Sequence, residues 1–453
     1  MKNKLEELIN YSLLYDVDYS ELFYEDSTTK MYTMNDSKLD NIDVTRINGV
    51  GIRLVKDGII YYGSTSNLDD AKNVIDNLKS NFNLRSDKKE VILVQKEIMS
   101  NVSKEKDITD IEKKELLLNI DKLARKNSKI TQVEAKIYEH NQNVVIANSN
   151  ADYVEDFRPL TRLIISVVAK ENDNVSRSYQ TYGASSGYEL LDTINLEEEV
   201  NNLVESAITK LSAINSPGGV MPVIIGPAFG AVIFHEACGH AMEATTVARG
   251  ISVLSNKLNT KIASDKVTII DDGTIKNGWG SVNVDDEGNL PRKNVLIENG
   301  YLKGYLIDYI NSFKMNMDYT GSGRRENYKY APTSRMNNTY LLEGTDSIDG
   351  MIKSIKYGLY AKDMGGGSVD PITGDFNFAV NEAYLIEDGK ITKPVKDASL
   401  IGNTLDILMN VEMVSDNLSF GTGFCGSESG SVPVLTGEPT IKVSSILVGG
   451  TNE

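Results

Sequence analysis

The chain has 453 residues and a formal net charge of −17 at pH 7, with no block of consecutive basic residues. A protein that binds the nucleic-acid backbone needs a basic surface, so this charge excludes nucleic acid as an expected partner. No stretch approaches the roughly 18 apolar residues of a membrane span, and residues 1–16 predict an amphipathic helix rather than a signal peptide. We therefore expect a globular protein without a membrane partner.

The chain is longer than one hydrophobic core usually holds, so two domains are expected. Its two cysteines, Cys238 and Cys425, are too few for a disulfide framework and favour a reducing, cytoplasmic location. Residues 215–219 read Asn-Ser-Pro-Gly-Gly, which ends a helix and favours a turn. This segment predicts an N-terminal domain over residues 1–214 and a C-terminal domain over residues 215–453.

The N-terminal domain alternates predicted strands with predicted helices. A capping box, Thr109-Asp110-Ile111-Glu112, marks the start of one of the helices. The predicted strands are 21–26, 44–64 (a hairpin that turns at 56–58), 131–140 and 160–171, and the predicted helices are 69–82, 109–127 and 196–213. This order predicts a mixed sheet covered by helices.

The C-terminal domain is richer in glycine turns and short apolar segments than the N-terminal domain. Residues 221–226 predict a buried strand, and the apolar segment 227–246 predicts a helix. Asn299-Gly300 and Asp388-Gly389 are strong hairpin signals. Short apolar segments that predict strands lie at 267–272, 294–308, 382–391 and 440–451. The expected fold class is α+β, with a C-terminal domain of mostly antiparallel strands around one helix.

That helix carries the hexapeptide His-Glu-Ala-Cys-Gly-His over residues 235–240. His235 and His240 are two of the three histidines of the chain, and Glu236 follows the first directly. Two imidazoles that hold an ion and a carboxylate that takes a proton from water are the parts of a hydrolytic zinc site. We therefore predict a metal centre here, with a buried helix carrying two hydrogen-bonded histidines as the alternative.

The spacing of the two histidines restricts the local backbone. Residues five apart differ by roughly 140° around an α-helix, so both imidazoles cannot face one ion from a regular helix. A π-type turn with i→i+5 hydrogen bonds would bring them together. We predict such an irregular turn over residues 235–240, with Gly239 allowing unusual backbone angles.

A catalytic zinc ion usually has three protein ligands and one open position. Cys425 lies in the glycine-rich segment 421–427 and would supply a thiolate. Glu243 follows His240 by about one turn, and we expect it to accept a hydrogen bond from an imidazole, although spacing also permits it to be a ligand. Cys238 lies in a crowded turn, and His140 has the context of an ordinary surface histidine. Spacing alone leaves the third ligand open.

Three segments of the chain resemble the TldD-type metallopeptidases of the TldD/PmbA family. They are HEACGHAME (235–243), GTGFCGS (421–427) and the C-terminal PTIKVSSILVGGT (439–451). The resemblance covers nearly the whole chain and is densest after residue 220. Further similar segments lie at 49–58, 285–288, 296–306, 319–344 and 365–403.

The resemblance implies a site and an activity. His235, His240 and Cys425 would bind zinc, one ion per chain, and Glu236 would be the catalytic carboxylate. The family hydrolyses peptides or unfolded polypeptide segments inside a closed dimer chamber. Its members act as homodimers, or as heterodimers with a TldE/PmbA-type subunit that lacks the metal motif.

Other motifs suggest weaker hypotheses. Arg324 and Arg325 form a short basic pair that would bind a peptide carboxylate or carbonyl oxygen, or else an ion partner at the surface. Gly366 and Gly367 predict a turn, or a stretch where the backbone meets substrate. The Gly-x-Ser-x-Gly match at 183–187 lacks the buried strand that a nucleophile elbow requires. The alternative function is a non-catalytic, zinc-containing subunit of a peptidase complex.

Overall fold

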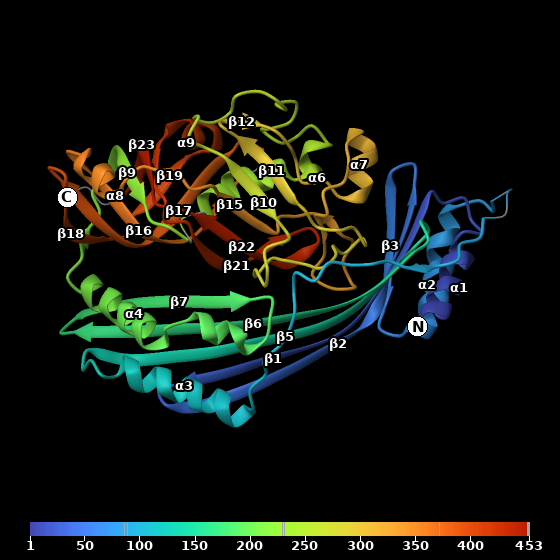
Figure 1. Ribbon diagram of the computed structural model, residues 1–453, viewed down its shortest axis with the longest axis horizontal. Coiled ribbons are helices and arrows are strands. Elements are labelled where there is room, and N and C mark those ends of the chain that lie inside the picture. The colour runs from blue at the N-terminus through green and yellow to red at the C-terminus, as the bar shows by residue number, and fades with distance from the viewer. Residues whose placement is uncertain (86, 88, 229, 231, 371, 451–453) are drawn as a thin grey trace.

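The computed structural model describes residues 1–450 except residues 86, 88, 229, 231 and 371. The chain folds into an α+β structure in which long strands of the N-terminal half lie against a β-rich C-terminal body (Figure 1). The α+β class predicted from the sequence is confirmed. No helix in the described part of the chain combines the length and apolar character needed to cross a membrane.

The N-terminal sheet has the strand order β3-β2-β1-β5-β6-β4, and β7 pairs with β6. The predicted strands are present but longer than expected, because β1, β2, β5 and β6 pair along nearly their whole lengths. The predicted turn of the β2–β3 hairpin is confirmed, with positive φ at Asp57 and Gly58. The strands are β1 (Tyr19–Asn35), β2 (Lys38–Lys56), β3 (Ile59–Thr65), β4 (Val94–Gln95), β5 (Ile130–Asn148), β6 (Asp152–Glu171) and β7 (Asn174–Ala184).

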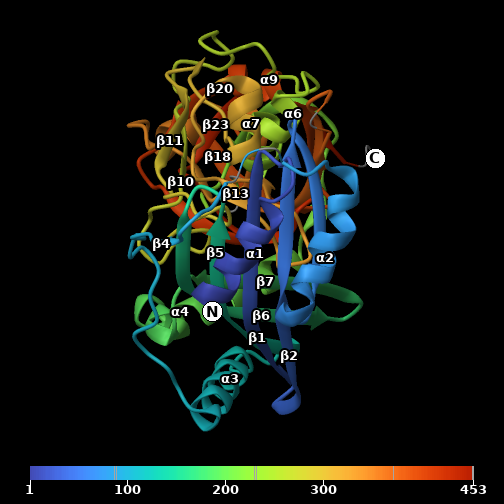
Figure 2. The same ribbon diagram turned by 90° about the vertical axis from the view of Figure 1, so that its right-hand side faces the viewer.

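Helices cover this sheet at its two ends. At one end, α1 and α2 bury their apolar residues against β1 and β2. Figure 2 shows these two helices next to the strands. At the other end, α3 and α4 pack on β5 and β6 (Figure 1), and the predicted capping box at Thr109 is present at the start of α3. The helical segments are α1 (Lys2–Ser12), η1 (Leu68–Asp70), α2 (Ala71–Leu78), η2 (Lys79–Asn81), α3 (Asp110–Ala124), η3 (Tyr188–Thr193) and α4 (Leu196–Lys210).

The C-terminal body contains a large sheet of order β16-β9-β23-β19-β17-β18-β8, with β20 paired to β23. The predicted buried strand at 221–226 is β9, and the predicted hairpin turn at Asp388 and Gly389 joins β17 to β18. The strands are β8 (Ile214–Asn215), β9 (Gly219–Ile225), β16 (Tyr357–Val369), β17 (Asp375–Glu387), β18 (Lys390–Lys396), β19 (Ser399–Asn403), β20 (Val411–Val414) and β23 (Ile441–Gly449). The division into domains at residue 214 stays a prediction.

A second sheet of this body has the order β12-β11-β10-β15-β22-β21. The predicted turn at Asn299 and Gly300 joins β11 to β12. As expected, most pairings are antiparallel, and those of β8–β18, β9–β16 and β15–β22 are parallel. The strands are β10 (Ile269–Asp272), β11 (Lys293–Glu298), β12 (Tyr301–Leu302), β15 (Asn338–Leu341), β21 (Ser419–Ser427) and β22 (Gly430–Glu438), and the short β13 (Gly323–Arg324) and β14 (Thr333–Ser334) pair separately.

The histidine motif lies inside this body, in the largest apolar core of the described chain. The predicted helix over 227–246 is interrupted, because Glu243 is extended and pairs with Leu306. Phe229, Ala231 and the predicted strand end Thr451 lie outside the described residues. The helical segments are α5 (Val232–Phe234), η5 (His235–Gly239), η6 (His240–Met242), α6 (Ala244–Val247), α7 (Tyr309–Met315), α8 (Ile348–Lys353) and α9 (Thr404–Asn410).

Buried ion pairs join the N-terminal sheet to the C-terminal body. Arg53 on β2 lies between Glu21 on β1 and Glu287, with Nη1 2.7 Å from Glu287 Oε1, and the side chains of all three are fully buried. Arg325 also bonds Glu21 from the C-terminal side. Charges buried in this way are stable only while each keeps its partner.

We expect Arg53→Met to lower the free energy of unfolding by about 3–5 kcal/mol, because it leaves Glu287 buried without its cation. Urea denaturation followed by circular dichroism measures the change. The control is Arg46→Met, which removes an exposed ion pair to Asp26 on the same hairpin and should cost less than about 1 kcal/mol. Equal losses in the two variants would contradict a structural role for the buried pairs.

Candidate metal centre

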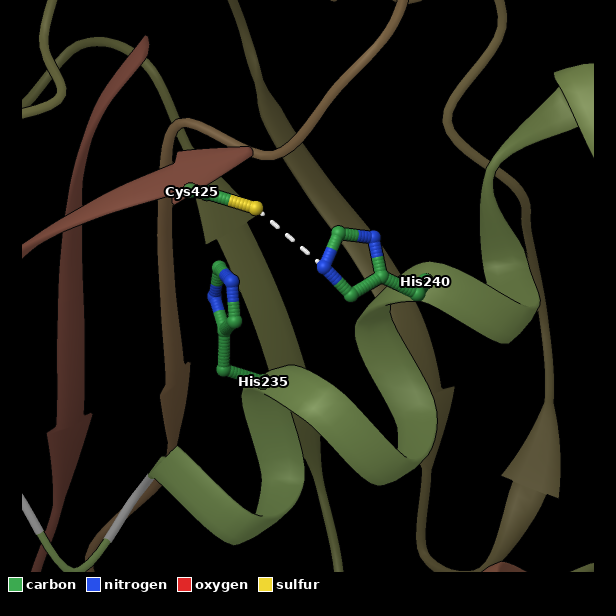
Figure 3. Close-up of side chains that lie close together, drawn as sticks. All are labelled: His235, His240 and Cys425. Atoms are coloured by element: carbon green, nitrogen blue, oxygen red, sulfur yellow. Dashed lines mark hydrogen bonds between the residues drawn. The ribbon is translucent and has the colours of Figure 1, made fainter. Parts of the chain in front are cut away.

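Three side chains predicted as metal ligands meet in the structure. One ligand atom each of His235, His240 and Cys425 lies within 4.8 Å of the other two. Cys425 Sγ is 3.2 Å from His240 Nε2, and Figure 3 shows both rings turned toward the thiol. The two imidazole rings are 5.3 Å apart, centroid to centroid, and nearly perpendicular. Residues 185 positions apart in sequence are therefore brought to one point.

A π-helical turn brings the two histidines together. Residues His235–Gly239 are π-helical, and the turn continues as a 3-10 segment from His240. The irregular turn predicted from the five-residue spacing is confirmed. Gly239 itself has ordinary helical angles, φ −57° and ψ −54°, so the predicted need for an unusual backbone there is wrong.

Packing explains the glycine instead. A Cβ atom added at Gly239 would lie 1.9 Å from Met336 Sδ. Met336 is fully buried beneath the π turn. The side chain of Met336 thus occupies the space that any residue other than glycine would fill, and it supports the turn from below.

Cys425 comes from β21, the last strand of its sheet. It pairs across the β21–β22 hairpin with Val432, whose side chain is in the same core. Burial alone would raise the pKa of the Cys425 thiol, but the facing His235 and His240 outweigh it and lower the pKa to about 4. The thiolate is the form that binds a metal ion.

The donor set fits zinc. Two imidazoles and a thiolate are borderline-to-soft ligands, and three such ligands leave one position of a tetrahedral ion open. His235 is 3% exposed, and its Nδ1 is buried with no hydrogen-bond partner among the described residues. A buried ring nitrogen without a hydrogen-bond partner lowers the stability of the fold unless an ion or another group binds it.

Two glutamates flank His240 on different sides. Glu243 Oε2 is 3.1 Å from His240 Nδ1, so it holds the ring with Nε2 directed at Cys425. Burial lowers the pKa of His240, but Glu243 outweighs it, and the pKa lies well above its ordinary value. Glu236 Oε2 is 3.6 Å from His240 Nε2, and the Glu236 side chain is 24% exposed. Glu236 therefore combines access to water with a place beside the ligand atoms.

The remaining ligand alternatives lie elsewhere. Cys238 is fully buried, and burial raises the pKa of its thiol, so it is held neutral. His140 lies on β5, where its Nδ1 is 2.8 Å from Thr29 Oγ1 and burial lowers its pKa to about 4. Neither belongs to the cluster that brings His235, His240 and Cys425 together.

Arg324 and Arg325 are buried and bond to the protein's own groups. Arg324 Nη1 donates to the carbonyls of Met336 (2.7 Å) and Pro433 (2.8 Å), and burial lowers its pKa to about 10. Arg325 is ion-paired with Glu21. The expected surface position of the pair is wrong, because both guanidinium groups serve contacts inside the protein. A role of either residue toward substrate stays a prediction.

Gly366 and Gly367 lie on β16, which contacts the π turn. They are part of a strand and not of a turn. A Cβ added at Gly366 would meet nothing within 4 Å, whereas one at Gly367 would collide with Phe378. In the described part of the chain, β16 pairs with β17 as far as Val369, but its pairing with β9 ends at Ala361, so the edge toward β9 is unpaired after that residue. Gly366 thus leaves open space on one face of β16.

Sequence reasoning missed two residues that support the centre, Arg335 and Met336. They lie in the segment 335–337, which links β14 to β15 and contains no motif of metal-site chemistry. The segment fell inside one of the stretches that resemble the family, but a resemblance of whole stretches does not indicate which residue packs under a turn. Only the folded chain places these two residues beside the centre.

Comparisons with known proteins cover nearly the whole chain. Residues 20–82, 103–213 and 218–450 match the families described as PmbA/TldA metallopeptidase domain 1, central domain and C-terminal domain. The chain is 37% identical to the metalloprotease TldD homolog of Haemophilus influenzae, over 96% of this chain and 94% of that protein. It is 33% identical to the homolog of Buchnera aphidicola subsp. Schizaphis graminum, over 99% and 97% of the two chains.

Solved structures share the fold at lower identity. TldE from Thermococcus kodakarensis is 21% identical with a TM-score of 0.76, covering 99% of this chain and 100% of that one. A Thermotoga maritima protein described as a candidate modulator of a DNA gyrase is 20% identical with a TM-score of 0.77, covering 95% and 96%. These two show the fold, whereas the family matches extend over nearly the whole sequence. The chain belongs to the PmbA/TldD metallopeptidase family.

Proposed function

We propose that this chain is a zinc-dependent peptidase that hydrolyses peptide bonds of small peptides or unfolded polypeptide segments. The observation that carries the proposal is the convergence of His235, His240 and Cys425, with the Glu236 carboxylate beside them. The names of relatives support it, since several are metalloproteases and one from Saccharolobus solfataricus is a zinc metalloprotease TldD homolog.

In this proposal, His235, His240 and Cys425 hold one zinc ion per chain. Zinc supplies a positive charge that polarises a carbonyl group and acidifies water. The facing imidazoles favour the thiolate of Cys425, which is the form that binds a metal ion, and a bound ion would displace the proton that the raised pKa of His240 keeps on its ring. Glu243 holds His240 through Nδ1, so that Nε2 is free to be the ligand atom.

Glu236 is the proposed general base. Its Oε2 would take a proton from the attacking water and later deliver it to the nitrogen of the leaving amine. The partial exposure of its side chain gives it the access to water that this role needs. The carboxylates of Glu21 and Glu287, which pair with Arg53, are fully buried and have no such access.

The substrate would bind as an extended strand. β16 contacts the π turn, its edge toward β9 is unpaired after Ala361, and main-chain pairing with such an edge tolerates many side chains. Gly366 leaves space open on one face of this strand, next to the residues that would pair with the peptide. Arg324 and Gly367 are further candidates for substrate contact.

We also propose a dimer, either of two copies of this chain or of this chain with a TldE/PmbA-type subunit. The similarity of its fold to TldE supports the second arrangement. The two free cysteines favour a reducing cytoplasm as its location. The alternative, a non-catalytic subunit whose zinc is structural, would need a closed site of four protein ligands.

Purified protein should contain about one equivalent of zinc per chain, measured by atomic emission. Exhaustive chelation should abolish peptide hydrolysis, and Cys425→Ser should lower the zinc content, because a neutral hydroxyl replaces a thiolate. The matched control is Cys238→Ala, which removes the other buried thiol and should keep the zinc. Full activity after chelation would exclude a metal-dependent peptidase.

Glu236→Gln should retain zinc and lose roughly 10²–10⁴-fold in kcat for peptide hydrolysis, because the amide keeps the size of the side chain but cannot accept the proton. The control is Glu115→Gln, on the exposed face of α3. A zinc-loaded wild type without activity in any subunit combination would favour the non-catalytic alternative. Near-normal turnover of Glu236→Gln would assign the base to another group.

Gly366→Val tests the strand edge. The new side chain would enter open space, so the fold and the zinc content should not change. We expect the KM for peptide substrates to rise about tenfold, equivalent to about 1.4 kcal/mol of binding free energy, because the branched side chain obstructs an incoming strand. Steady-state kinetics measures KM, and zinc content with the thermal unfolding midpoint are the controls. An unchanged KM would place the substrate elsewhere.

A further inference from the structure

Arg335 is a fully buried arginine in the segment between β14 and β15, and it contacts both halves of the metal centre. Its Nη2 donates a hydrogen bond to the backbone carbonyl of Cys425. Its Nη1 donates to Ser429 Oγ (3.0 Å) and to the carbonyl of Gly430 (2.9 Å). One guanidinium group therefore binds the β21–β22 hairpin on both sides of its turn.

The third nitrogen of Arg335 faces the histidine motif. Nε is 3.7 Å from Glu243 Oε1, an ion pair in which the side chains are 0% and 6% exposed. Neither of these two atoms has a hydrogen-bond partner among the described residues. Glu243 is thus the carboxylate that neutralises the buried Arg335, and its other oxygen holds His240 Nδ1. A buried charge requires such a partner.

These contacts close a ring. Cys425 is joined through its carbonyl to Arg335, Arg335 to Glu243, Glu243 to His240, and His240 Nε2 to Cys425 Sγ at 3.2 Å. The two ligand residues are far apart in sequence and come from different elements. Within the ring, Arg335 links the hairpin that carries Cys425 to the turn that carries His240.

We propose that Arg335 is a positioning residue of the metal centre, which sets the separation between the Cys425 thiolate and His240 Nε2 before an ion binds. The inference rests on the proposed zinc centre and adds to it a residue outside the motif. It does not make Arg335 a catalytic residue, because Arg335 contacts the backbone carbonyl of Cys425 and the carboxylate of Glu243 and not the ligand atoms themselves.

The planar fork of the guanidinium is required for this role. Arginine presents five N–H donors in fixed directions, whereas lysine has a single nitrogen on a flexible stem. Lysine at position 335 would keep the charge opposite Glu243 or the contact with the hairpin, but not both. Arg335→Lys should therefore fall between the wild type and Arg335→Met.

The test measures zinc affinity by competition with a chromophoric chelator. Arg335→Met should bind zinc about 10–100-fold more weakly than the wild type, the usual effect of losing an outer partner of a metal ligand. Arg335→Lys should lose less. In the cobalt-substituted protein, the thiolate-to-cobalt charge-transfer band should weaken or shift in both variants, because the Cys425 Sγ position is no longer fixed.

The matched control is Arg162→Met. Arg162 Nη2 donates to the carbonyl of Thr422, on the same strand as Cys425, at 2.9 Å, and Arg162 has no contact with Glu243. Its loss should leave zinc affinity within about twofold. Combining Arg335→Met with Glu243→Gln should weaken zinc binding little more than either change alone, because both variants open the same ring.

The outcomes separate the two proposals. Wild-type protein without stoichiometric zinc would overturn the metal centre and, with it, this role of Arg335. Zinc-loaded wild type with unchanged affinity and an unchanged cobalt spectrum in Arg335→Met would overturn the positioning role alone, as would an equal loss in Arg162→Met. If Arg335→Met does not fold, Arg335→Lys and Glu243→Gln decide by the same two measurements.

Discussion

The structure of the site depends on one geometric constraint. Two imidazoles five residues apart must face a thiol that comes from a strand 185 positions later. A regular α-helix cannot do this, and the π turn over His235–Gly239 satisfies the constraint at the cost of weaker helical geometry. The turn is stable there because it lies in a dense core, with Met336 filling the space beneath Gly239.

The two cysteines show how strongly position decides chemistry. Both thiols are buried, yet the pKa of Cys238 is raised by burial whereas that of Cys425 is lowered to about 4. The difference is the pair of imidazoles that faces Cys425 and stabilises its thiolate. Cys238 is thus an inert side chain of the core, whereas Cys425, a residue of the same type, is a candidate metal ligand.

Side chains from both halves of the chain cover main-chain groups of β21. Arg162 on β6 donates to the carbonyl of Thr422, and Trp279 Nε1 donates to the carbonyl of Gly423 at 2.7 Å. These contacts occupy main-chain groups of β21, the last strand of its sheet, and so oppose the addition of another strand there. The edge of β16 toward β9 pairs only as far as Ala361, so it is the edge to which the proposal assigns an extended peptide.

Fold and function rest on different evidence in this family. TldE and the candidate gyrase modulator from Thermotoga maritima share the fold at 20–21% identity. A shared fold supports many activities, so the activity must be argued from the residues of the site. The proposal made here rests on the histidine pair, Cys425 and Glu236, and the relatives at 33–37% identity are named as metalloproteases.

The sequence by itself determined the local features of this protein. The capping box at Thr109, the hairpin turns at Asp57-Gly58, Asn299-Gly300 and Asp388-Gly389, and the π turn were all predictable. The capping box and the hairpin turns depend on the backbone preferences of a few consecutive residues. The π turn followed instead from the five-residue spacing of two histidines that would face one ion. The resemblance to the family then indicated Cys425, a choice that spacing had left open.

Only the tertiary structure decided the features that depend on distant neighbours. The strands are longer than the apolar segments that predicted them. Main-chain pairing along β1, β2 and β5 includes polar residues that the hydrophobic pattern does not mark as strand. Arg324 and Arg325 are buried, because carbonyls and Glu21 from other segments satisfy their charges. Arg335 joins Cys425 to Glu243 for the same reason: a buried guanidinium takes its partners from whatever the fold brings near, and no local pattern encodes them.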